Sequence, residues 1–221
     1  MKEKPDSVNK EVTSPSSRRL KSTGLEKTAS ALYAAALVGL LAVKPEVFLI
    51  SATLLFILLV CLWDWRSYRI PNLFTYPTMA AALIYHAAAA GWSGILLGIF
   101  GVFLGGSLLL LPHLMGGVGA GDVKTLAALG ALWGAGPALQ IFIITALMGG
   151  IVAVAILIAR GELMNNLKRY WSILKVLVVT RKFIYIGPSH RVREFKIPYG
   201  AVISLGVAAW LFGGPLLQEL I

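Results

Sequence analysis

The sequence predicts an all-α protein, a polytopic membrane helix bundle with about six to seven membrane helices. Hydrophobic residues make up 57% of the 221 residues and charged residues only 14%. A soluble globule of this composition would have too little polar surface. Because one helix needs roughly 20 apolar residues to cross about 30 Å of hydrocarbon, the chain has room for these helices and short connections only.

The net charge of +10 is confined to two segments. Lys and Arg cluster in residues 1–27 and in residues 160–196, both next to apolar stretches. This is the positive-inside pattern, which places both segments in the cytoplasm and favours contact with anionic membrane lipid. A nucleic-acid partner is not expected, because the charge does not form a soluble basic face.

The chain divides into a tail and one membrane domain. Residues 1–28 hold two prolines, several serines and mixed charge, which predicts a flexible basic cytoplasmic tail. Residues 29–221 form the membrane-embedded domain. Its helices are expected at residues 29–43, 47–63, 73–90, 93–111, 123–133, 138–159 and 197–212.

Turn residues separate the first helices. The Lys44-Pro45-Glu46 turn ends the first one, and the second stops at the polar residues that begin with Asp64. Pro71 suits the start of the third helix, because proline fits the first turn and not the interior. Gly91 and Trp92 close that helix, and the fourth follows directly.

The later helices are separated by glycine and by charge. A glycine-rich stretch, 115–122, precedes the fifth helix, and the turn 134–137 precedes the sixth. The first and fifth helices are shorter than a full span, so each is expected to be tilted, extended or re-entrant. The connection 160–196 has nine Lys and Arg against two Glu. Its mixture of aromatic and basic residues over 167–186 predicts a helix in the headgroup layer; docking of a substrate is the alternative.

Two aspartates are the candidate chemical groups. Six acidic residues follow the tail, and four of them fall in turns or near the end of the sequence. Asp64 and Asp122 each adjoin an apolar segment, and alternating the helices across the membrane puts both on the cytoplasmic face. Carboxylates at such depth are costly, so an acid retained there is by default a functional candidate.

A pair of close carboxylates can hydrolyse a peptide bond. The two groups share a proton, so one acts as base toward a water while the other donates to the carbonyl oxygen. Neither a metal nor a cofactor is expected. Cys61 is the single cysteine, the three histidines are scattered, and neither a Gly-x-Ser-x-Gly motif nor a Cys-His pair provides a nucleophile.

Glycines surround the second aspartate. Gly119 and Gly121, with two more just upstream, remove side-chain bulk, so that an extended substrate backbone can approach Asp122. The alternative is that Asp122 only caps the fifth helix. Because Asp64 follows one helix C-terminus and Asp122 precedes a helix N-terminus, the helix dipoles favour Asp64 as holder of the shared proton.

Three segments resemble one family in the same order. Gly119-Ala120-Gly121-Asp122 matches the Gly-x-Gly-Asp signature of the type IV prepilin and preflagellin peptidases. The segment from Asp64 through Arg66, Arg69 and Ile70-Pro71-Asn72 resembles the first aspartate segment of that family, and Ile197-Pro198-Tyr199-Gly200 resembles its closing helix.

The resemblance implies an aspartic endopeptidase of the cytoplasmic (inner) membrane of a prokaryote. It would cut the short basic leader from pilin-like precursors, with Asp64 and Asp122 as the catalytic pair. Substrate or loop support would come from Gly119, Gly121, Lys124, Arg66, Arg69, Pro71 and Asn72. The chain lacks the cysteine-containing insertion of the long members, so methyltransferase activity is not expected, and it is similar to the short Flp/Tad-type enzymes. A non-catalytic component of a pilus or secretion assembly, or a small transporter, is the alternative.

Overall fold

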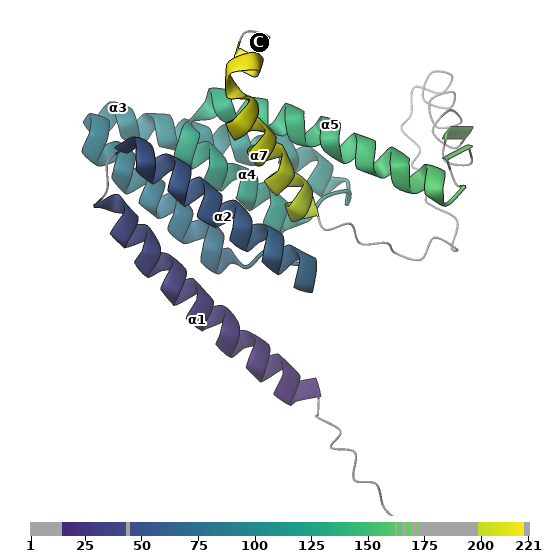
Figure 1. Cartoon of the computed structure of the whole chain (residues 1–221), viewed down its shortest axis with the longest axis horizontal. Helices are drawn as coiled ribbons and strands as arrows, with labels where there is room; N and C mark the ends of the chain where they lie inside the picture. The colour runs from purple at the N-terminus through teal and green to yellow at the C-terminus, as the bar shows by residue number, and fades with distance from the viewer. Residues whose placement is uncertain are drawn as a thin grey trace, which may run out of the picture.

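The chain forms a bundle of helices in the computed structural model, which describes residues 15–42, 45–161, 163–164, 167–168, 171 and 199–218. No strand occurs in these ranges, so the all-α prediction is confirmed there. Figure 1 shows the helices with assigned bounds: α1 (Pro15–Leu41), α2 (Pro45–Ser67), α3 (Asn72–Leu114), α4 (Ala120–Trp133), α5 (Ala135–Ala159) and α7 (Tyr199–Gln218).

Helix α3 consists of two arms folded against each other at Gly91. The backbone of Gly91 has φ 60° and ψ −133°, which is not helical. A Cβ atom on Gly98 would lie 2.8 Å from the side chain of Leu83, although 15 residues of straight helix would separate them by about 22 Å. The two arms are the expected third and fourth helices, and glycine supplies the positive φ that the turn requires.

Helix α4 forms the centre of the bundle. Figure 1 shows it among the longer helices, and all of its residues from Thr125 to Leu132 are buried. Its 14 residues give a length of about 21 Å, too short to cross the hydrocarbon layer alone. The short fifth helix predicted from the sequence is therefore an inner helix that its neighbours cover. Trp133 Nε1 donates to Thr53 Oγ1 at 2.8 Å and ties α4 to α2.

The outer surface of the bundle is apolar, which confirms a membrane helix bundle. Among the described residues, α2, α3 and α5 are long and apolar enough to cross a membrane, and Tyr199–Gly213 is a shorter apolar helix. Large side chains such as Phe103 (75% exposed) and Phe212 (80% exposed) face outward. A soluble protein rarely exposes so many large apolar groups together, so lipid is the solvent of this surface.

Several helix ends differ from those expected. Helix α1 begins at Pro15 instead of residue 29, so residues 15–28, which were assigned to the tail, are helical. Figure 1 shows this part of α1 leaving the bundle. Helix α2 continues through Asp64 to Ser67, and α4 already begins at Ala120. The predicted headgroup helix at 167–186 and residues 1–14 lie almost entirely outside the described residues.

Candidate active site

Asp64 lies where α2 meets the start of α7. The two helices run antiparallel, because Gly200 contacts Asp64 while Ser204, one turn further along α7, donates to the Ile57 carbonyl at 3.0 Å. The side chain of Asp64 is only 5% exposed. Its Oδ2 accepts the Gly200 N–H at 2.7 Å, and the Ala201 N–H also bonds the carboxylate. The N-terminus of α7 thus directs free amides at this acid.

Gly200 has to be a glycine for this contact. A Cβ atom there would lie 3.0 Å from Asp64 Oδ2 and 3.1 Å from Asp64 Cβ, tighter than nearly all observed contacts. The missing side chain lets the α7 backbone come within hydrogen-bond distance of the carboxylate.

Asp122 lies in the first turn of α4 and is 8% exposed. Its Oδ2 accepts the Gly119 N–H at 3.1 Å, so Asp122 does cap this helix, as the alternative interpretation held. This hydrogen bond uses only one of the two carboxylate oxygens of Asp122, and the same side chain also lines a cavity. Gly121 allows the start of α4 to pack closely against Ile70, because a Cβ atom on Gly121 would lie only 3.0 Å from Ile70 Cβ.

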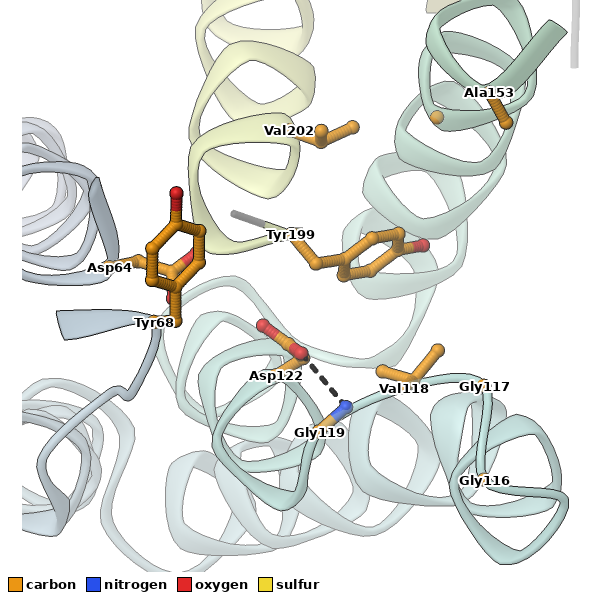
Figure 2. Close-up of a pocket in the computed structure, with 11 residues that line it drawn as sticks. Asp64, Tyr68, Gly116, Gly117, Val118, Gly119, Asp122, Ala153, Tyr199 and Val202 are labelled. Atoms are coloured by element: carbon orange, nitrogen blue, oxygen red, sulfur yellow. Dashed lines mark hydrogen bonds between the residues drawn. The ribbon is translucent and has the colours of Figure 1, made fainter. Parts of the chain in front are cut away.

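One cavity of about 460 Å³ contains both acids. Figure 2 shows Asp64 and Asp122 on neighbouring sides of it, with the rings of Tyr68 and Tyr199 beside them. The glycine-rich loop 116–119 forms another wall. The two acids, 58 sequence positions apart, therefore lie at the same end of the bundle; that this end faces the cytoplasm stays a prediction. A second cavity of about 370 Å³ also borders both acids.

The environment of Asp122 favours its protonated form. Burial is the main cause that raises the pKa of Asp122 to about 7; the negative charge of Asp64 contributes to the rise, and the Gly119 amide and the charge of His113 oppose it. Asp122 lies in the first turn of α4, outside the three candidate spans. Asp64 is buried as well but receives two backbone amides, against one for Asp122, and from this difference we infer that Asp122 is the better holder of a shared proton. The dipoles of α2 and α4 alone favour the opposite assignment, with the shared proton on Asp64. The difference arises because the N-terminus of α7 also points at Asp64.

The predicted supporting residues lie mostly around the second cavity. Lys124 Nζ donates to Asn72 Oδ1 at 2.8 Å and lies 5.4 Å from the ring centroid of Tyr76. Lys124, Asn72 and Arg69 all line this cavity. Pro71 is buried and precedes the first residue of α3, with φ −65°.

Arg66 is the exception among these predicted residues. It is exposed and lines neither of the two cavities that contain the acids.

Sequence reasoning missed three contributors to the site. Tyr68 lines both cavities and has φ 51°, a strained value for a non-glycine residue, and no sequence signal marks it. Tyr199 also lines the larger cavity, within the segment that resembled the closing helix. His113 Nδ1 lies 2.9 Å from the Val118 carbonyl oxygen and so holds the glycine-rich loop.

Hydrolysis by two acids fits this arrangement. A carboxylate bonded by amides and a second carboxyl with a pKa near 7 can share one proton at neutral pH. The cavity leaves room between the acids and the glycine-rich loop for a peptide backbone and a water. Among the described residues, no group of three or more His, Cys, Asp or Glu side chains comes together as a metal site would require.

Comparison with known proteins gives one match. Residues 48–154 match the model of the type IV leader peptidase family. The matched range includes both Asp64 and Asp122. No curated protein and no solved structure matches the chain.

Proposed function

We propose that the chain is an aspartic endopeptidase that removes the short basic leader from pilin-like precursors. The starting point is that it belongs to the type IV leader peptidase family and is a membrane peptidase. The observation that carries this proposal is that Asp64 and Asp122 line the same cavity of about 460 Å³. Their separation in the sequence and their origin on different helices make a shared cavity an unlikely accident of packing.

The proposed mechanism assigns a different role to each acid. Asp64 acts as the ionised base, because the Gly200 and Ala201 amides stabilise its charge. It takes a proton from the water that attacks the scissile carbonyl. Asp122 begins protonated and donates to the carbonyl oxygen, which forms a neutral tetrahedral intermediate. Asp64 then gives its proton to the leaving nitrogen while Asp122 takes the proton of one hydroxyl, so that the C–N bond breaks, a carboxylic acid and an amine form, and both aspartates return to their starting states.

The proposed setting is the cytoplasmic (inner) membrane of a prokaryote, with the acids toward the cytoplasm. The supporting observation is the excess of Lys and Arg in residues 160–196, which follow α5 in the sequence, together with Gly149 and Ala153 near the end of α5, which line the cavity. Anionic lipid would bind these residues. We do not propose methyltransferase activity, because the long members that have it carry paired cysteines and this chain has only Cys61.

The decisive experiment uses single Asp64→Asn and Asp122→Asn variants in detergent with a pilin-like precursor. Asparagine keeps the shape of each side chain but cannot exchange the proton, so we expect cleavage to fall by about 1000-fold or more in each. Glu26→Gln, which changes an acid on α1 far along the chain from the site, is the matched control and should cut normally.

Cleavage at the wild-type rate by either aspartate variant would refute the proposal. If both variants still cut while filament assembly stops, the chain is a component of an assembly machine whose aspartates are not catalytic. Circular dichroism and gel filtration of each variant show whether a lost activity reflects lost folding.

A further inference from the structure

The two cavities that border the acids share four lining residues. Three of them have a role described above: the acids Asp64 and Asp122, and Gly119, whose amide caps Asp122. The fourth is Tyr68, which has the largest side chain of the four. A peptide bond held at the acids has chain on both sides of it. A peptide that extends into both cavities therefore passes Tyr68.

The backbone holds Tyr68 at this junction in an unfavourable conformation. Its φ is 51°, and among the residues that the structure describes it is the one non-glycine residue with a positive φ. A residue with a Cβ atom loses free energy in this conformation, whereas glycine does not. Hydrogen bonds hold the turn: the Tyr68 N–H donates to the Asp64 carbonyl at 2.8 Å. Ser67 Oγ lies 2.8 Å from the Trp63 carbonyl oxygen and 3.1 Å from that of Arg69.

Burial of the side chain does not explain why Tyr68 adopts this conformation. The side chain is 51% exposed and is not part of the apolar core that the described residues form. Figure 2 shows its ring on the α2 side of the larger cavity, across from the glycine-rich loop. Backbone strain that is not repaid by packing is a feature of functional sites, where the position of the side chain is what matters.

We propose that the ring of Tyr68 contacts the substrate peptide where it passes from one cavity to the other, and so holds the scissile bond over the two acids. This inference rests on the proposed function and deepens it, because it makes the substrate an extended peptide that occupies both cavities. A tyrosine ring gives a large, rigid contact at a low cost in side-chain entropy. Such a contact increases the rate when it keeps the carbonyl carbon within about 3–3.5 Å of the attacking water.

Three variants separate the ring from the backbone strain. Tyr68→Phe keeps the ring, Tyr68→Ala removes the ring but keeps a Cβ atom in the strained conformation, and Tyr68→Gly removes both. We expect kcat/KM for a pilin-like precursor to stay within about threefold of wild type in Tyr68→Phe and to fall about 30-fold in the other two. The Tm of Tyr68→Gly in detergent should exceed that of Tyr68→Ala by roughly 2–4 °C, because glycine relieves the strain. A more stable variant that cuts poorly would show that the strained residue serves the reaction and not the fold.

Trp65→Ala is the matched control. Trp65 lies three residues before Tyr68 at the same end of α2, is 70% exposed and lines neither of the two cavities. Its removal should leave kcat/KM unchanged. An aromatic ring at this level can also anchor a helix in the headgroup layer. Equal effects of Tyr68→Ala and Trp65→Ala on cleavage would assign Tyr68 to such anchoring and overturn the inference, as would wild-type cleavage by Tyr68→Ala.

The length of the substrate tests whether the ring acts on the peptide itself. Peptides that keep about two residues, roughly 7 Å of extended chain, on one side of the cut barely enter the cavity on that side. For them we expect Tyr68→Ala to lower kcat/KM by about threefold at most, against about 30-fold for the precursor. An equal loss with every substrate would mean that the variant disturbs Asp64, whose carbonyl the Tyr68 backbone bonds, and would overturn the inference. Failure of the proposed function is recognised separately, because the wild-type chain would then not cut, or the Asp64→Asn and Asp122→Asn variants would.

Discussion

Replacing Gly101 by alanine should push α3 and α4 apart and thereby displace Asp122, which α4 carries. The second arm of α3 crosses α4 where Gly101 meets Gly130. A Cβ atom on Gly101 would lie 1.9 Å from the Gly130 carbonyl oxygen and 3.0 Å from Gly134 Cα. Both neighbours are backbone atoms, so no change of side-chain rotamer can relieve the overlap.

The size of the effect follows from these distances. An ordinary contact is about 3.4 Å, so α3 and α4 must separate by about 1.5 Å. Overpacking of this kind costs typically 1–3 kcal/mol and occasionally more, and we expect about 3 kcal/mol. For a protein of this size that corresponds to a fall in Tm of roughly 6–12 °C. Because α4 carries Asp122, a shift near 1 Å should also lower kcat by about 100-fold.

The control is another glycine of the same arm. A Cβ atom on Gly106 would lie 3.7 Å from Ala127 Cβ, which is normal packing, so Gly106→Ala should change neither Tm nor kcat noticeably. Thermal unfolding in detergent and cleavage of a precursor measure the two quantities for both variants. If Gly101→Ala unfolds within about 1 °C of Gly106→Ala, the close helix contact and the reasoning built on it are wrong.

The remaining predictions concern the protonation of Asp122 and the two histidines that bond backbone carbonyls. With the pKa of Asp122 at about 7, kcat should fall as the pH rises above 7, because the pair then loses its shared proton; a flat profile up to pH 9 would contradict this. Because the pKa of Asp122 is about 7 in the folded chain and about 4 in an unfolded one, the folded state becomes less stable as the pH rises from about 4 to 7. Asp122→Asn removes this titration and should flatten the dependence of Tm on pH. His113→Ala releases the Val118 carbonyl and should lower kcat about tenfold, with partial recovery in His113→Asn, whose amide can donate. His86→Ala, which loses a similar bond to the Leu132 carbonyl at the far end of α4, should lower Tm and leave kcat unchanged.

Local patterns were sufficient to locate the helices of the core and the two acids. Apolar runs identified the spans, and Gly91 marked the fold between the arms of α3 because no other residue type accepts its φ as easily. The start of α1 was missed because apolar content, which reports burial in lipid, stops at residue 29 while helix propensity continues toward Pro15.

Contacts between distant segments were beyond such patterns. That α7 would direct its amides at Asp64 depends on how the whole bundle packs, and for that reason the helix dipoles alone could not settle which acid holds the proton. Asp122, whose partner Gly119 is three residues away, could be placed from the sequence. Tyr68 could not be predicted as part of the site, because neither its residue type nor its neighbours indicate a positive φ.

The bond between the Gly200 amide and Asp64 spans 136 residues, and this separation has a consequence during biogenesis. A nascent chain inserts its earlier helices, and with them both acids, while α7 is still being synthesised. Until α7 has been inserted, Asp64 lacks the Gly200 and Ala201 amides that stabilise the charge of its carboxylate and orient it. Under the proposed mechanism, cleavage therefore requires α7, and we expect a chain that ends before α7 to insert without becoming active.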